Sequence, residues 1–102
     1  MKIEWSEPAV SDVAGIHDYI ARDSEQYANR FVQRIFDSVE KLQQFPELGR
    51  RVRETDDELV REVIHQNYRI IYRVEPARLL VLAVVHGGRD LGQAEPKPWE
   101  TF

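Results

Sequence analysis

The sequence predicts an α+β fold in which an N-terminal strand and a helical hairpin accompany a mainly antiparallel sheet of three to four strands. Two observations predict the sheet: residues 68–75 alternate between apolar and charged side chains, and residues 79–85 (LLVLAVV) are apolar at every position. A third predicts the hairpin, because residues 8–45 carry apolar side chains at helical spacing in two segments. We expect the helices to pack on one face of the sheet, and residues 1–102 to form a single domain.

The N-terminal half is predicted to contain one strand and two helices. Residues 2–5 (KIEW) are a short strand candidate. Residues 6–8 (SEP) then combine a capping hydroxyl, an acidic first turn and a proline where no helical hydrogen bond is lost. Helices are therefore expected over residues 8–22 and 25–45. The apolar stripe of the second helix is expected to extend to Phe45, and the proline that follows ends it.

The second half is predicted to supply the remaining strands. Residues 59–65 are a strand candidate, joined by a short turn to the alternating segment, whose Arg69 and Arg73 are expected on a face open to solvent. The apolar run 79–85 is expected to be a central strand covered on both faces. Residues 50–58 are expected to be a charged loop or a frayed strand. The predicted core residues are Phe31, Ile35, Leu42, Ile70, Tyr72, Val81 and Ala83.

The composition argues against several classes of protein. The chain has no cysteine, which rules out a disulfide framework and a cysteine-ligated metal site. No apolar run approaches the roughly 18 residues of a membrane span. The first ten residues lack the apolar segment of a signal peptide, so a cytoplasmic protein with no membrane partner is expected. No phosphate loop, metal-spaced histidine pair or nucleophile motif is present, and neither a metal nor a cofactor is expected.

The net charge of −4 is unevenly distributed along the chain. Residues 1–47 carry five basic and nine acidic groups, whereas residues 48–89 carry eight basic groups, all arginine, and six acidic groups. A nucleic-acid-binding protein usually has a clear basic excess, which this chain lacks. The pattern indicates an arginine-rich sheet on an acidic helical body, or alternatively a mixed solvated surface.

Arg69, Arg73 and Arg89 form the main candidate binding constellation. Arg69 and Arg73 share one face of a strand, at a separation of about 13 Å, and Arg89 follows the neighbouring strand. Clustered guanidinium groups suit the recognition of phosphate or carboxylate through paired hydrogen bonds. The alternative is that Glu62 and Glu75 neutralise them in surface ion pairs.

The three histidines differ in what their positions suggest. His86 ends the apolar strand just before Gly87 and Gly88, where an imidazole with a free pKa of about 6.5 could act as a general acid or base. The alternative is a hydrogen-bonded strand end. His17, on the first helix near its apolar stripe, is expected to be a packing residue, and His65, beside a turn, a solvated surface group.

The order of strand, helical hairpin and three strands resembles the RelE/ParE superfamily of bacterial type II toxin–antitoxin systems, and the chain looks most like the ParE branch. The resemblance covers about residues 3–91, and the order and spacing of the motifs carry it. The matching residues are Trp5, Ala9, Val13, Ile16, Tyr19-Ile20-Ala21, Phe45-Pro46-Glu47-Leu48-Gly49-Arg50, Arg61-Glu62, Tyr68-Arg69-Ile70-Ile71-Tyr72-Arg73 and His86-Gly87-Gly88-Arg89-Asp90.

The resemblance implies one of two activities. RelE-like members cleave messenger RNA on the ribosome, and Arg69 and Arg89 match two arginines of that active site, with His86 as a further catalytic candidate. Val60 and Glu62 stand where such nucleases carry lysines, and no tyrosine follows Arg89. ParE-like members lack this catalytic set and poison DNA gyrase, which is the activity we expect. A non-toxic binding module of the same fold is a third alternative.

The resemblance also implies a cognate antitoxin as partner. Trp99 and Phe102 are large apolar residues on a proline-containing tail (residues 92–102), and we regard them as antitoxin-binding candidates. For the target, either gyrase or the ribosome with its messenger, the binding candidates are Arg61, Arg69, Arg73 and Arg89.

Overall fold

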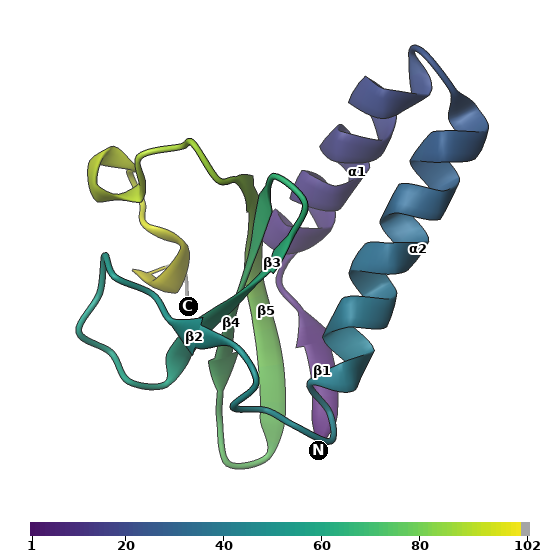
Figure 1. Cartoon of the computed structure of the whole chain (residues 1–102). Helices are drawn as coiled ribbons and strands as arrows, with labels where there is room; N and C mark the ends of the chain where they lie inside the picture. Colours follow the sequence, from purple (N-terminus) through teal and green to yellow (C-terminus); the bar gives the residue numbers. More distant parts are fainter. Residues whose placement is uncertain (101–102) are drawn as a thin grey trace.

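The computed structural model describes residues 1–100, which form a five-stranded sheet with two helices against one face (Figure 1). This α+β architecture confirms the predicted fold class. The strands lie in the order β1-β5-β4-β3-β2; β1 runs parallel to β5, and every other pair is antiparallel. The elements are β1 (Lys2–Trp5), α1 (Glu7–Ala21), α2 (Glu25–Lys41), β2 (Arg50–Arg51), β3 (Val60–His65), β4 (Tyr68–Val74), β5 (Arg78–His86) and two short 3-10 helices, Leu91–Gln93 and Pro98–Glu100.

Both helices begin at a serine cap. The hydroxyl of Ser6 accepts the N–H of Ala9, and that of Ser24 accepts the N–H of Tyr27, so each satisfies a donor that the first helical turn leaves free. The second helix ends at Lys41, four residues earlier than predicted. Pro46 disfavours helical geometry in the residue before it, and the chain unwinds through turns ahead of it. Phe45 therefore leaves the apolar stripe and is 62% exposed.

The central strand is β5, as predicted from its unbroken apolar run. It pairs with β1 on one side and β4 on the other. Ile71 of β4 lies opposite Ala83, but the next residue, Tyr72, lies opposite Val81, so Leu82 is an extra residue on β5. Because of this β-bulge, odd-numbered β5 residues face the helices before Leu82 (Leu79 and Val81), whereas after it the even-numbered Val84 does.

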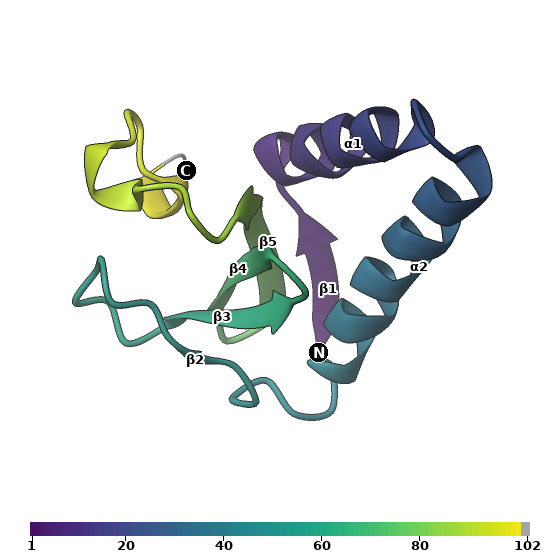
Figure 2. The same ribbon diagram turned by 45° about the horizontal axis from the view of Figure 1, so that its top comes forward.

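The sheet is covered on both faces. The helices pack on one face, where Phe31, Ile35 and Val39 of α2 and Leu42, the residue that caps its C-terminal end, join a core that also contains Ile70, Tyr72 and Val81. The opposite face carries a second core, formed by sheet residues together with Val52, Leu91 and Trp99 from the loop after β2 and the C-terminal segment. Figure 2 shows this segment and that loop on the side of the sheet away from the helices. All seven predicted core residues are buried, Ala83 within the second core.

The predicted sheet was one strand too small. Arg50 and Arg51 pair with Glu62 and Arg61, which adds β2 as a two-residue edge strand in the region expected to be a loop or a frayed strand. A tight turn at residues 66–67 joins β3 to β4, and Gln66 adopts a left-handed backbone with φ of 52°. None of the helices in residues 1–100 is long and apolar enough to span a membrane.

Candidate functional site

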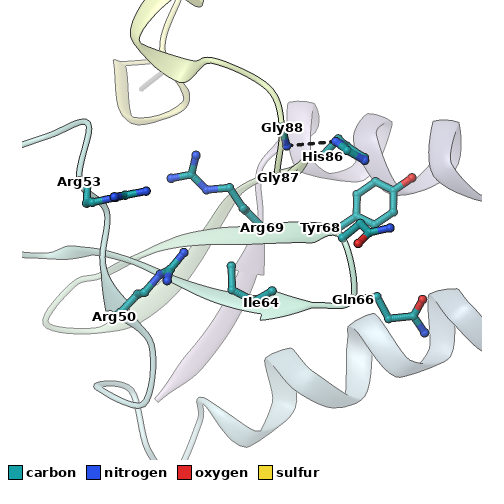
Figure 3. A pocket seen from close by; sticks show the side chains of 10 residues that line it. Arg50, Arg53, Ile64, Gln66, Tyr68, Arg69, His86, Gly87 and Gly88 are labelled. Carbon is teal, nitrogen blue, oxygen red and sulfur yellow. Dashed lines mark hydrogen bonds between the residues drawn. The ribbon is translucent and has the colours of Figure 1, made fainter.

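A basic hollow of about 440 Å³ opens at the end of the β3–β4 hairpin (Figure 3). Its cationic side chains come from three places: Arg50 on β2, Arg53 in the following loop and Arg69 on β4. The remaining lining residues are Ile64, Gln66, Asn67, Tyr68, His86, Gly87 and Gly88. No carboxylate is among these lining residues, so the hollow is locally basic on a chain whose net charge is −4. Three guanidinium groups in one hollow are suited to binding oxyanions such as phosphate or carboxylate.

Arg69 is held by two carboxylates. Its two terminal nitrogens each donate to one oxygen of Glu54 at 2.8 Å, and its Nε donates to Glu62 at 2.6 Å. The second oxygen of Glu62 accepts from Nε of Arg50 at 2.7 Å, so Glu62 links two arginines of the hollow. These bonds from Arg69 hold the pKa of the Glu54 carboxyl below its usual value, and the carboxylates raise the pKa of Arg69. In this arrangement the fork of Arg69 is already occupied by a carboxylate.

The predicted open arginine face is therefore wrong in one respect. Arg69 and Arg73 do share the face opposite the helices, but Arg69 is only 8% exposed. Arg73 donates to the carbonyl of Trp99 at 3.0 Å and lies 3.5 Å from a carboxylate oxygen of Asp57. The loop after β2 and the C-terminal segment cover this face, because its Ile71 and the β5 residues beside it are apolar and need a cover.

The remaining arginine candidates lie elsewhere. Arg61 pairs across the strands with Tyr72, on the helix side of the sheet, and donates to the carbonyl of Gly49 at 2.8 Å. Arg89 is exposed and is not among the residues that line the basic hollow; its charge acts on Asp12 of α1. Within residues 1–100 no hydrogen bond or salt bridge from the Arg89 side chain is found. The structure thus separates Arg61 and Arg89 from Arg69.

The predicted carboxylate partners were partly correct. Glu62 does neutralise arginine, but as a buried group and not in a surface pair. Glu75 binds Arg78 at 2.6 Å, and no hydrogen bond or ion pair joins it to Arg69 or Arg73 within the described residues. The main partner of Arg69 is Glu54, which the sequence analysis did not single out.

His86 lies on the rim of the basic hollow, where Figure 3 shows it above Tyr68. Its Nδ1 accepts the N–H of Gly88 at 3.1 Å, which leaves the proton of the neutral ring on Nε2. The two rings meet edge to face, with centroids 5.7 Å apart. His86 thus places an exposed ring with a defined neutral tautomer in the lining of the hollow that also contains the three arginines.

The other two histidines make packing and hydrogen-bonding contacts within the fold. The ring of His65 meets that of Phe31 edge to face at 5.1 Å, and burial lowers its pKa, so the expectation of a solvated surface group was wrong. His17 is half-buried and links the helices through a 2.8 Å hydrogen bond from its ring to the side chain of Asn29, in line with the packing role expected for it. Within residues 1–100 no cluster of three or more histidine, aspartate or glutamate side chains could hold a metal ion.

Of the two antitoxin-binding candidates in the tail, the structure describes Trp99. Trp99 is half-buried and packs against the second core, and its carbonyl receives the bond from Arg73. Phe102 lies outside the described residues.

The sequence did not identify Arg50 and Arg53, which line the hollow, or Glu54, whose carboxylate accepts two hydrogen bonds from Arg69. All three lie in the segment RRVRE at residues 50–54. The density of charged residues in this segment was the available signal, but no local pattern relates it to Arg69, which lies fifteen residues after Glu54.

The described residues thus combine a helical hairpin on a small mixed sheet with an open basic hollow at the end of the β3–β4 hairpin. The family described as "ParE toxin of type II toxin-antitoxin system, parDE" matches residues 3–91, and the chain belongs to this family. Toxin RelE2 of Caulobacter vibrioides is 30% identical over 88 residues, which cover 86% of this chain and 97% of that protein. A chain of the chromosomal ParDE system from P. aeruginosa has the same fold, with a TM-score of 0.70 and 25% identity over 84% of this chain and 95% of that one.

Proposed function

We propose that this toxin inhibits DNA gyrase by binding to it and does not cut RNA. The chain is a toxin of a type II toxin–antitoxin system, which implies an antitoxin that neutralises it. Gyrase is an intracellular target, so the proposal includes a cytoplasmic location. One observation carries the choice between the two activities: Arg69, the cation that a ribonuclease of this fold would present to phosphate, is bonded to Glu54 and Glu62.

Two features of the charge distribution support this proposal. A ribonuclease must supply a base for the 2′-hydroxyl, an acid for the leaving oxygen and cations for the developing phosphorane charge. Arg89 is not among the residues that line the hollow with His86 and Arg69, which argues against a single site built from all three groups. Arg89 is instead an exposed cation that is available to a protein surface. The net charge of −4 opposes long-range attraction to ribosomal RNA.

The test is a supercoiling assay with purified gyrase. The unmodified protein is expected to inhibit supercoiling, and Arg89→Ala to raise the concentration needed by about fivefold, because an exposed charge contact contributes about 1 kcal/mol. Arg30→Ala, a change of the same kind on the exposed surface of α2, serves as the control and should inhibit like the parent. An unchanged supercoiling rate at a saturating amount of the protein would overturn the proposal.

Messenger cleavage on the ribosome is the second candidate, and a specific observation favours it. His86 and Tyr68 line the same hollow as Arg50, Arg53 and Arg69. If a ligand displaced Glu54, cationic groups and a titratable imidazole would face it together. Ribosome-dependent cleavage at the A-site codon, abolished by Arg69→Ala while gyrase stays unaffected, would establish this function in place of gyrase inhibition.

A further inference from the structure

The edge of β3 extends beyond its short neighbour β2. Arg50 and Arg51 of β2 pair with Glu62 and Arg61, and no residue of the described chain pairs with the outer edge of β3 beyond Glu62. In Figure 3, Ile64 lies on this free part of β3, between Arg50 and Gln66.

The backbone of Ile64 faces outward along this edge. The carbonyl of Val60 accepts a hydrogen bond from Val52, which shows that Val60 directs its polar groups toward β2. Successive residues of a strand alternate in this direction, so Glu62 and Ile64 direct theirs to the same side. The carbonyl of Leu59 accepts a hydrogen bond from Val74 of β4 at 2.9 Å, so the alternate residues Leu59, Arg61 and Val63 direct their polar groups inward. Ile64 therefore presents one N–H donor and one carbonyl acceptor at an unpaired edge.

Cations and apolar side chains surround the free edge. Besides the basic hollow, a second hollow of about 410 Å³ lies on its other side, and its lining includes Lys41, Leu48 and Gly49 together with the buried, arginine-paired Glu62. Arg50 and Ile64 line both hollows, which therefore meet at this edge. The side chain of Ile64 is 50% exposed and that of Leu48 is 61% exposed. Arg53 is exposed as well, and no hydrogen bond or salt bridge from it is found within residues 1–100.

We propose that the edge at Ile64 is a docking site for an extended segment of a partner protein in which carboxylate and apolar side chains alternate. Such a segment would continue the sheet from the point where β2 ends, and its backbone would bond to Ile64. Side chains of a strand alternate between faces. Those on the face of Ile64 would meet Arg50 and Arg53, and those on the other face would meet Leu48 and the aliphatic stem of Lys41.

The chemistry of the edge favours a peptide over a nucleic acid. A nucleic-acid backbone offers no pattern of alternating N–H and carbonyl groups to match a strand edge, and it would leave the polar groups of Ile64 unused. Glu54 and Glu62 pair with Arg69, and Glu62 also pairs with Nε of Arg50, so Arg53 and the terminal nitrogens of Arg50 are the cationic groups left beside the edge. A few carboxylates placed along one face of a strand match this number better than a continuous polyphosphate. This contact is separate from the proposed role of Arg89 at gyrase.

The probe is a capped ten-residue peptide that alternates glutamate and valine, titrated into the isotope-labelled full chain. Amide chemical shifts are expected to move first at Ile64 and at Arg50. A peptide of the same length with lysine in place of glutamate should bind at least tenfold more weakly, because it places like charges beside Arg50 and Arg53. A single-stranded oligothymidylate of ten nucleotides tests the polyanion alternative.

Three variants separate edge pairing from general charge attraction. Ile64→Pro removes the outward N–H without breaking a bond to β4, since proline is tolerated at an edge position of this kind, and should weaken the peptide at least tenfold. Arg53→Glu should weaken the glutamate peptide and strengthen the lysine peptide. Arg51→Glu is the matched control: its cross-strand partner is Arg61, on the helix side of the sheet, and peptide affinity should change less than twofold.

Three results would overturn the proposed docking site. Absence of any shift at Ile64, or equal binding of the two peptides, would overturn the proposal. So would oligothymidylate that binds at this edge more tightly than the glutamate peptide. Thermal melting of each variant identifies any that fails to fold, and Arg53→Glu, an exposed change, then carries the test.

Discussion

At the residue scale, Arg69 shows how a guanidinium can be present on a functional face and still be unavailable. Its fork is filled by Glu54 with paired bonds at 2.8 Å, a geometry that a phosphate or an external carboxylate would also use. Breaking this pair leaves Arg69 with Glu62 alone in a site where it is 8% exposed. A buried charge that loses a partner is costly, so the pair contributes to folding as well as to the charge of the hollow.

Glu54→Gln is expected to reduce stability and to change its dependence on pH. The folded pKa of Glu54 lies below the unfolded value of 4.5, because Arg69 bonds to the charged form. The pair therefore stabilises the fold above pH 4.5, and this stabilisation is lost as the pH falls through the lowered folded pKa. We expect the variant to lose about 1–2 kcal/mol at pH 7 and to show a flatter fall in stability below pH 4.5.

Urea unfolding at pH 7 and at several values below pH 4.5 measures both effects. Glu58→Gln is the matched control, because Glu58 is exposed in the same loop and no hydrogen bond or ion pair is found for it within residues 1–100. It should unfold like the parent throughout. Equal stability of the parent and Glu54→Gln at pH 7 would contradict the assigned role of the Glu54–Arg69 pair.

At the element scale, the start of α1 completes the edge of the central strand. β1 pairs with β5 only as far as Val81, and beyond that point side chains take over from the missing strand. The hydroxyl of Ser6 donates to the carbonyl of Leu82 at 3.0 Å, and the carboxylate of Asp12 accepts the N–H of Val84 at 2.9 Å. Ser6 is thus both a helix cap and a substitute for a strand partner.

The two serine caps are expected to differ in energetic weight. Ser24→Ala removes one exposed bond and should cost about 0.5–1 kcal/mol. Ser6→Ala removes the cap bond to Ala9 and leaves the carbonyl of Leu82 without its partner, in a position where Ser6 is buried, and should cost about 2–3 kcal/mol. Urea unfolding with an unchanged m value measures the difference; equal losses would show that the bond to Leu82 contributes nothing.

At the scale of the whole molecule, the periodicity of the sequence predicted the helices and the central strand. It did not predict contacts between segments that are far apart in the chain. The apolar run around Val81 and the helical spacing of Phe31 and Ile35 correctly predicted two helices on a central strand. Periodicity also placed Arg69 and Arg73 on one face. It could not show that this face is covered, because no local pattern relates them to the segments that pack over it.

Two segments that are far apart in the sequence cover the face of the sheet opposite the helices. The loop after β2 contributes Val52 and Glu54, and the C-terminal segment contributes Leu91 and Trp99. The apolar residues of these segments are few and irregularly spaced, with two in the loop (Val52 and Leu59) and four in residues 91–102, so neither segment gives a periodic signal. Their burial follows from the apolar residues of β5 that the helices leave uncovered, such as Leu82. The tail candidate Trp99 thus lies on the body of the protein in this structure.

The second core predicts that the C-terminal segment stabilises the fold unequally along its length. Leu91 is fully buried against the sheet, and Leu91→Ala should cost about 2–5 kcal/mol through lost burial and the cavity left behind. Truncation after Ala94 retains Leu91 and removes the half-buried Trp99, so it should cost less, about 1–2 kcal/mol. Thermal and urea unfolding measure both, with Gln93→Ala, an exposed neighbour, as the control. If the truncation were as damaging as Leu91→Ala, Trp99 would be as important to this core as Leu91. If both changes were neutral, the helix-side core alone would hold the fold.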